Sequence, residues 1–124
     1  MRTVMRTVHL LVVLRTDPHA SLHAVEARDF ALAALAFEQR VSLLLMGDGV
    51  GLLRPGQDPA GIAREDLLPG LRALLHHGLD RVVVVSEDLA ERGLEPAALA
   101  LPTTLVDRRG LAGFLAAHDH CVGF

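Results

Sequence analysis

The sequence predicts an α/β fold: one domain whose doubly wound, parallel, five-stranded sheet is flanked by helices. Short apolar runs recur along the chain without polar alternation, which is typical of strands buried on both faces. Longer helical patterns separate these runs, so that strands and helices alternate as they do around a parallel sheet. The length of 124 residues suits a single domain over 1–124, in which residues 1–6 are expected to form a ragged N-terminus.

Five apolar runs are the predicted strands. They are rich in valine and leucine, and β-branched residues favour an extended backbone. The third run is the clearest of the five because it contains four consecutive valines. In chain order, the predicted strands are Val8–Leu14, Val41–Met46, Asp80–Val85, Thr103–Val106 and Cys121–Phe124.

The first helix is predicted to follow Ser21, a good N-terminal cap, and to run to about Glu38. Its apolar residues recur at spacings of three and four, which indicates a face that packs on the sheet. This predicted core-facing stripe consists of Leu22, Val25, Phe30, Ala33, Ala34 and Phe37.

Three further helices are predicted. One begins near Pro69 and ends before Gly78, because proline suits a first helical turn and glycine suits a helix end. A short helix over 87–92 follows Ser86 as its cap. The last helix, over 108–117, has an aspartate as its cap.

The composition excludes several classes of function. The net charge is −3, all twelve cations are arginine, tryptophan and tyrosine are absent, and there is one cysteine. Without lysine, the chain has no Schiff-base chemistry, no P-loop and no phospho-receiver pocket. Without a basic field or stacking aromatics, we expect no direct binding of nucleic acid. A single cysteine excludes an internal disulfide and a multi-thiolate zinc site.

No apolar run approaches the roughly 18 residues of a membrane-spanning helix. The short apolar stretch near the start lacks a signal-peptide cleavage site and is better explained as a first strand. These features predict a soluble, cytoplasmic protein, and no cofactor is predicted.

The segment 47–61 contains five glycines and two prolines and follows the second predicted strand. A connection this long in a small α/β domain often carries function or forms an interface. We expect its apolar side chains to be exposed and to form a subunit interface. The alternative is that the loop covers the protein's own sheet. The predicted interface residues are Asp48, Gly49, Val50, Leu52, Leu53, Pro55, Gly56 and Gln57.

Three polar residues, Asp17, Asp48 and Ser86, each follow a predicted strand. Because parallel strands place their sites at their carboxyl ends, these side chains are candidates for lining a shared crevice. His19 and His23 lie four residues apart and are weak candidates for a metal site. The glutamate of an H-E-x-x-H motif is missing between them, so no metal is predicted.

Nucleophilic catalysis has little support in the sequence. Cys121, the single thiol, lies in the last apolar run, where an inert cysteine is usual, so it is a weak candidate for catalysis. A Ser/His/Asp set can be assembled around Ser42 or Ser86, but no G-x-S-x-G motif is present. Hydrolysis is therefore not predicted.

Four local motifs occur together in the chain. They are Asp48-Gly49-Val50-x-Leu52-Leu53-x-Pro55-Gly56-Gln57, Gly78-Leu79-Asp80, Glu91-Arg92-Gly93-Leu94 and His118-Asp119-x-Cys121-Val122-x-Phe124. With these motifs, the chain from about Val8 to Phe124 resembles the TusC/DsrF branch of the DsrE/F/H-like family. The resemblance implies a subunit of a bacterial sulfur-relay assembly with DsrE/TusD-like and DsrH/TusB-like partners. Such assemblies pass persulfide sulfur towards 2-thiouridine formation in tRNA, or serve sulfur oxidation.

The resemblance also locates the relay chemistry. In DsrE/TusD-like members the carrier cysteine follows the third strand, where this chain has Val84-Val85-Ser86-Glu87. A hydroxyl group cannot form a persulfide, so the resemblance implies a non-catalytic, scaffolding subunit with no activity alone. The alternative function is a stand-alone, homo-oligomeric protein that binds a small metabolite or metal at the strand ends.

Overall fold

A computed structural model of the chain describes residues 7–55 and 67–124. The predicted N-terminal segment 1–6 therefore lies outside the described residues, as do Gly56 and Gln57 of the predicted interface. No helix within the described ranges is long and apolar enough to cross a membrane.

Five parallel strands form one sheet, which confirms the predicted fold class. The strand order is β4-β3-β2-β1-β5, so the chain adds strands on one side of β1 and returns to its other side for the last strand. Each strand lies within one or two residues of its predicted bounds. The strands are β1 (His9–Leu14), β2 (Arg40–Leu45), β3 (Val82–Val85), β4 (Thr104–Val106) and β5 (His120–Gly123).

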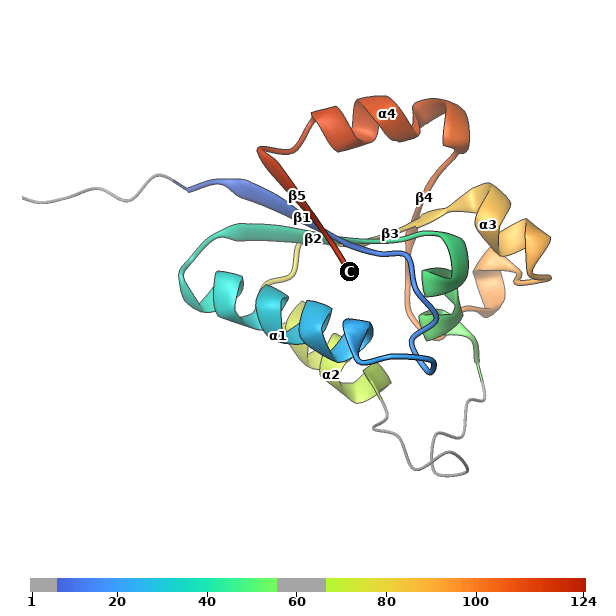
Figure 1. Ribbon diagram of the computed structural model, residues 1–124, viewed down its shortest axis with the longest axis horizontal. Helices are drawn as coiled ribbons and strands as arrows, with labels where there is room; N and C mark the ends of the chain where they lie inside the picture. The colour runs from blue at the N-terminus through green and yellow to red at the C-terminus, as the bar shows by residue number, and fades with distance from the viewer. Residues whose placement is uncertain (1–6, 56–66) are drawn as a thin grey trace, which may run out of the picture.

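The helices cover the sheet on both faces (Figure 1). Helices α1 (His23–Ala36) and α2 (Leu67–His76) lie together on one face, and α4 (Arg108–Ala116) lies on the other. The short helix α3 (Ser86–Glu91) follows β3 directly. Ser86 is thus the first residue of α3 and not its cap, because Val85 takes the cap position with extended backbone angles.

Glycine and aspartate mark the helix ends as predicted. Gly78 after α2 and Gly93 after α3 have φ angles of +109° and +65°, a conformation that side chains other than glycine rarely adopt. Asp107 caps α4, and its carboxylate accepts a hydrogen bond of 2.7 Å from the backbone N–H of Gly110.

The first helix packs on the sheet by a different face from the predicted one. Its buried residues are Ala24, Ala27 and Ala31, whereas Leu22 and Phe37 are each 66% exposed. Apolar residues occur on almost every side of α1, so their spacing did not reveal which side faces the sheet. The alanine face lets the helix approach β1 and β2 closely, and close packing decided the orientation.

The segment after β2 is also different from its prediction. Residues Gly47–Leu53 form a 3₁₀-helix, η1, and Val50, Leu52 and Leu53 are 0%, 7% and 0% exposed. The expectation that these side chains are exposed at an interface is therefore wrong. The tight turns of η1 direct these three side chains into the core shared with α1 and α2. The interface role of the remaining loop residues stays a prediction.

Candidate functional site

The carboxyl end of β3 is the place where the resemblance locates a carrier cysteine in related subunits. Here Ser86 occupies it, and its hydroxyl group donates to Glu87 Oε1 at 3.0 Å. A second, longer contact of 3.5 Å joins the same hydroxyl to the backbone oxygen of Val106 at the end of β4. The serine is thus held between two neighbouring strand ends in a half-buried position.

A network of charged side chains surrounds Ser86. The buried carboxylate of Asp88 accepts a hydrogen bond of 2.8 Å from the backbone N–H of Gly47 and a second from the Arg108 guanidinium. Arg108 also binds Glu91 at 2.8 Å, and its backbone N–H donates to Glu87 at 3.0 Å. The network therefore ties η1, α3 and the start of α4 together across the strand ends.

The network keeps its carboxylates ionised. Burial acts to raise the pKa of Asp88, but the Gly47 N–H and the Arg108 guanidinium outweigh it, so the pKa lies below its ordinary value. The backbone N–H of Arg108 likewise lowers the pKa of the Glu87 carboxyl group.

The three predicted crevice residues each have separate partners. Asp17 accepts a hydrogen bond of 2.8 Å from the backbone N–H of His19 in its own turn. Asp48 forms a 2.8 Å ion pair with Arg92, and its side chain is 68% exposed. Within the described residues, no hydrogen bond or ion pair joins Asp17, Asp48 and Ser86 to one another. They share only their position after a strand.

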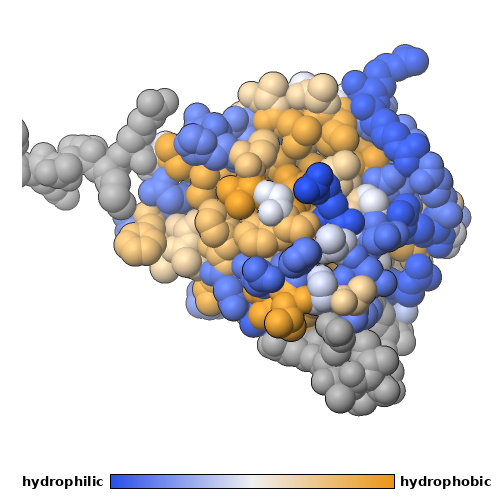
Figure 2. Space-filling model, in the orientation of Figure 1, coloured by the Kyte–Doolittle hydropathy of each residue, from blue (hydrophilic) through white to orange (hydrophobic). Residues whose placement is uncertain are grey.

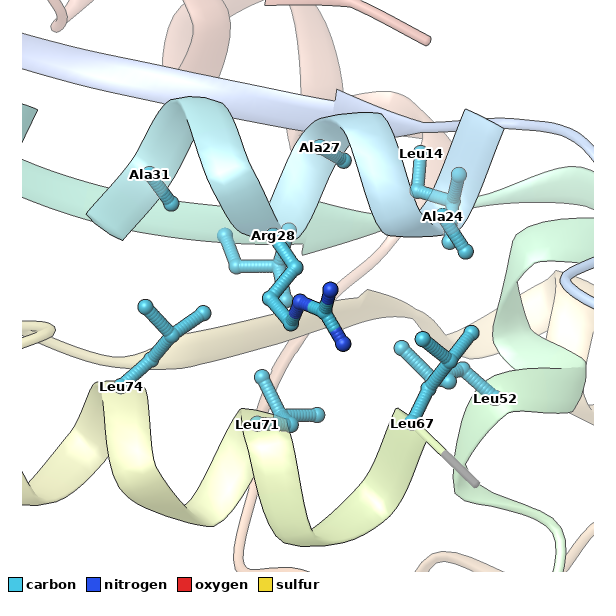
Figure 3. A pocket seen from close by; sticks show the side chains of 10 residues that line it. Leu14, Ala24, Ala27, Arg28, Ala31, Leu52, Leu67, Leu71 and Leu74 are labelled. Carbon is cyan, nitrogen blue, oxygen red and sulfur yellow. The ribbon is translucent and has the colours of Figure 1, made fainter. Parts of the chain in front are cut away.

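Two hollows in the described part can be compared with these positions, and neither is lined by the three residues. Figure 3 shows the first, between α1 and α2, where leucine and alanine side chains face one another and Arg28 crosses the gap. Its volume of about 20 Å³ is room for one water molecule, far below the space that a metabolite needs. The second is an open groove of about 520 Å³ along residues 96–105, at the start of β4.

The histidines that were weak candidates for a metal do not form a ligand cluster. No group of three or more His, Cys, Asp or Glu side chains within the described residues is arranged to hold a metal ion. The backbone N–H groups of His19 and His23 are bound by the side chains of Asp17 and Ser21, which are turn and helix-start contacts.

Cys121 lies far from Ser86. It is exposed on β5, and its thiol donates to the backbone oxygen of Leu115 at 3.6 Å. Strands β2 and β1 separate β3 from β5, and a spacing of about 4.8 Å per strand places β3 and β5 roughly 14 Å apart. Cys121 also pairs with Leu11, near the amino end of β1, whereas Ser86 lies beyond the carboxyl end of β3.

A second polar cluster, which the sequence analysis missed, lies at the amino end of the sheet. His9 Nε2 is 3.0 Å from Ser42 Oγ, and Ser42 Oγ is 3.5 Å from a carboxylate oxygen of Asp80. This arrangement has the residue types of a hydrolytic triad, but Ser42 is 0% exposed and no substrate can reach it. The cluster is a buried hydrogen-bonded contact between β1, β2 and the start of β3.

His118 completes the amino-end cluster. Its ring centroid is 4.4 Å from that of His9, and its Nδ1 is 2.8 Å from the backbone oxygen of Phe114. Its Nε2 is buried without a hydrogen-bond partner. Because a carbonyl oxygen only accepts hydrogen bonds, Nδ1 is the nitrogen that donates to Phe114. No local motif in the sequence indicates this cluster, because 109 positions separate His9 from His118.

The amino-end cluster predicts a loss of stability in mild acid. Burial, the adjacent His118 and the Arg40 cation lower the pKa of His9 below its ordinary value, and Asp80 opposes them. The fold therefore favours neutral His9, so its contribution to stability is complete above pH 6.5 and decreases as the pH falls below it. We expect the melting temperature to fall between pH 7.5 and 5.5, and to fall less in His9→Gln. An equal fall in both proteins would contradict the role of His9.

Comparison with known proteins gives consistent matches over the chain. The model of the DsrE/DsrF-like family matches residues 9–124. A protein named TusC homolog from Pseudomonas aeruginosa is 38% identical over 113 residues, which cover 91% of this chain and 95% of that protein. The intracellular sulfur oxidation protein DsrF from Allochromatium vinosum is 36% identical over 80 residues, or 64% of this chain and 59% of that protein. The crystal structure of the ychN protein from E. coli has the same fold, with a TM-score of 0.81 at 20% identity over 95% of this chain and all of that chain.

Proposed function

Because the chain belongs to the DsrE/DsrF-like family, we propose that it is a scaffolding subunit of a sulfur-relay complex, without catalytic activity of its own. Its partners in this proposal are DsrE/TusD-like and DsrH/TusB-like subunits, and the complex works in the cytoplasm. The similarity to TusC homologs and to DsrF supports a pathway of tRNA 2-thiouridine synthesis or of sulfur oxidation.

The observation that carries this proposal is the chemistry at the end of β3. A relay subunit needs a thiolate that accepts a sulfane sulfur and passes it to the next cysteine. Here the position has a hydroxyl group that binds Glu87 and Val106, next to the ionised carboxylate of Asp88. A hydroxyl group cannot form a persulfide, so the residue at this position cannot act as a sulfur carrier.

The place of the single thiol supports the same proposal. Sulfur passes between two cysteines only when their sulfur atoms come into contact. Two strands lie between β3 and Cys121 on β5, and Cys121 is near the opposite end of the sheet. A partner that delivers sulfur to the end of β3 therefore does not reach Cys121 from the same position.

This proposal predicts that the thiol is dispensable. In the assembled complex, Cys121→Ser should retain nearly the full rate of sulfur transfer, because the exposed thiol makes one long contact and leaves the β1–β5 pairing unchanged. The measurement is transfer of ³⁵S from a persulfide donor to the final acceptor. The control is a partner subunit whose carrier cysteine is replaced by serine, which should abolish transfer. A loss in Cys121→Ser as large as in that control would show that Cys121 is itself a carrier.

A further inference from the structure

The outward side of α1 is unusually apolar for a surface. Four of the five large apolar side chains that are exposed in the described ranges belong to α1 or its immediate flanks. They are Leu22, Phe30, Leu32 and Phe37. Surfaces of this kind are rare on proteins that act alone and are common where another protein binds.

We define the α1 outer face by four apolar residues and two acidic ones, which are Phe30, Leu32, Ala33, Phe37, Glu26 and Asp29. All six are exposed, on the side of the helix opposite the buried Ala24, Ala27 and Ala31. Phe30 also contacts the Phe124 ring at the end of the chain, with 5.8 Å between centroids. The face therefore continues towards β5, the edge strand of the sheet.

Figure 2 shows a broad hydrophobic area between α4 and α1, and hydrophobic and hydrophilic residues lie side by side over α1 itself. In Figure 1 the same view has α1 and the end of β5 towards the reader. Apolar side chains lie on the outer side of α1 as well as on its buried side, whereas a helix that packs on one surface normally has a polar outer side. The composition of α1 thus indicates a second covering surface that the isolated chain does not supply.

The charges on this face identify the kind of partner. Within His23–Ala36, the outer face carries the carboxylates of Glu26 and Asp29 and no cation. Arg28 binds Asp29 at 3.1 Å from the side, but its own side chain is 22% exposed and extends towards α2 (Figure 3). A two-fold pairing of this face with a second copy would place carboxylates and no cation on both sides of the interface, which is unfavourable.

We propose that the α1 outer face is the docking surface for a different protein subunit, one with an apolar centre bordered by arginine or lysine. This inference rests on the proposed scaffolding function and names the surface through which the chain joins the assembly. The apolar side chains supply the contact area, and Glu26 and Asp29 select a cationic partner over a second copy.

The test is a substitution that blocks docking and leaves the chain folded. Ala33→Arg places a long cationic side chain at the centre of the face, and arginine is a good helix former. The matched control is Ala112→Arg, the same change at an exposed position of α4. Each variant is co-expressed with the DsrE-like and DsrH-like subunits of the same organism, and native mass spectrometry measures the assembly. Far-ultraviolet circular dichroism confirms that each variant is folded.

We expect Ala33→Arg to weaken assembly by about a hundredfold or more and Ala112→Arg to leave it unchanged. Equal assembly in both variants, or equal loss in both, overturns the docking surface while the scaffolding function stands. If the wild-type chain itself forms no complex with these subunits, both proposals fail. If the wild-type chain self-associates and Ala33→Arg prevents this, the occupant is a second copy and the proposed partner is wrong.

A second variant tests the charge of the partner. Glu26→Gln together with Asp29→Asn keeps the size of both side chains and removes both charges. We expect assembly to weaken by about tenfold at low salt and by less at 0.5 M salt, where screening has already reduced the attraction. An unchanged assembly at both salt concentrations contradicts a cationic partner.

Discussion

Converting Leu52 and Leu53 to aspartate is expected to unfold the isolated chain. Both leucines are almost fully buried in the core under α1 and α2. Removing two buried leucines costs about 4 kcal/mol or more, and two carboxylates without partners add to this cost. The sum is comparable with the roughly 5–15 kcal/mol of stability that a domain has in total. Thermal and urea unfolding of the isolated chain measure the effect.

The matched control is a leucine-to-aspartate change at the surface. Leu22 is 66% exposed and occupies the cap position of α1, where aspartate is favourable. Leu22→Asp is expected to change stability by about 0.5 kcal/mol or less. If the Leu52/Leu53 variant instead melts like the wild type and differs only in its assembly, η1 is an interface and not part of the core.

The sheet was predictable because its strands are buried on both faces. The four valines of β3 are all buried, and such a run has few alternatives to a central strand. The glycines at 78 and 93 were equally clear signals, since their positive φ angles are what the helix ends require. For these elements, local composition and tertiary environment favour the same structure.

The orientation of α1 and the environment of η1 were not predictable, and the two errors have one cause. Apolar side chains lie on nearly every side of α1, and the apolar residues of η1 show no clear period, so hydrophobicity does not distinguish the side facing the sheet from the side facing outward. The distance between α1 and the sheet decides which side of the helix is buried. The small side chains of Ala27 and Ala31 fit between the helix and the sheet, whereas those of Phe30 and Phe37 are too large. The proposed docking surface is therefore on α1, and Val50, Leu52 and Leu53 belong to the core.

The candidate site was predictable in part. The position of Ser86 at the end of β3 followed from chain order alone, because every predicted strand is present in the sheet. The network around it was not predictable, since Asp88 binds Gly47 and Arg108 from 41 and 20 positions away. Contacts of this kind depend on which strand ends become neighbours, and a single sequence contains no pattern for that.

Gly49→Ala is expected to destabilise the fold although it adds only one methyl group to η1. A β-carbon at this position would overlap the Leu14 carbonyl oxygen and lie 2.8 Å from its carbon, closer than real atoms approach. That oxygen accepts the hydrogen bond of 3.1 Å from Met46 N–H at the junction of β1 and η1, so the backbone cannot move aside without weakening the junction. We expect a loss of about 3 kcal/mol and a melting temperature about 10 °C lower.

Gly51→Ala, two residues further along the same 3₁₀-helix, provides the comparison for this prediction. A β-carbon there meets Pro18 Cδ at 3.9 Å, an ordinary van der Waals contact, and Gly51 does not have a positive φ angle. The substitution should therefore change stability by less than about 1 kcal/mol, and it can stabilise the fold by reducing the freedom of the unfolded chain. Since both variants add one methyl group to a glycine of η1, the difference between their melting temperatures measures the contact with Leu14. Equal melting temperatures would show that η1 does not pack against the end of β1 as closely as described.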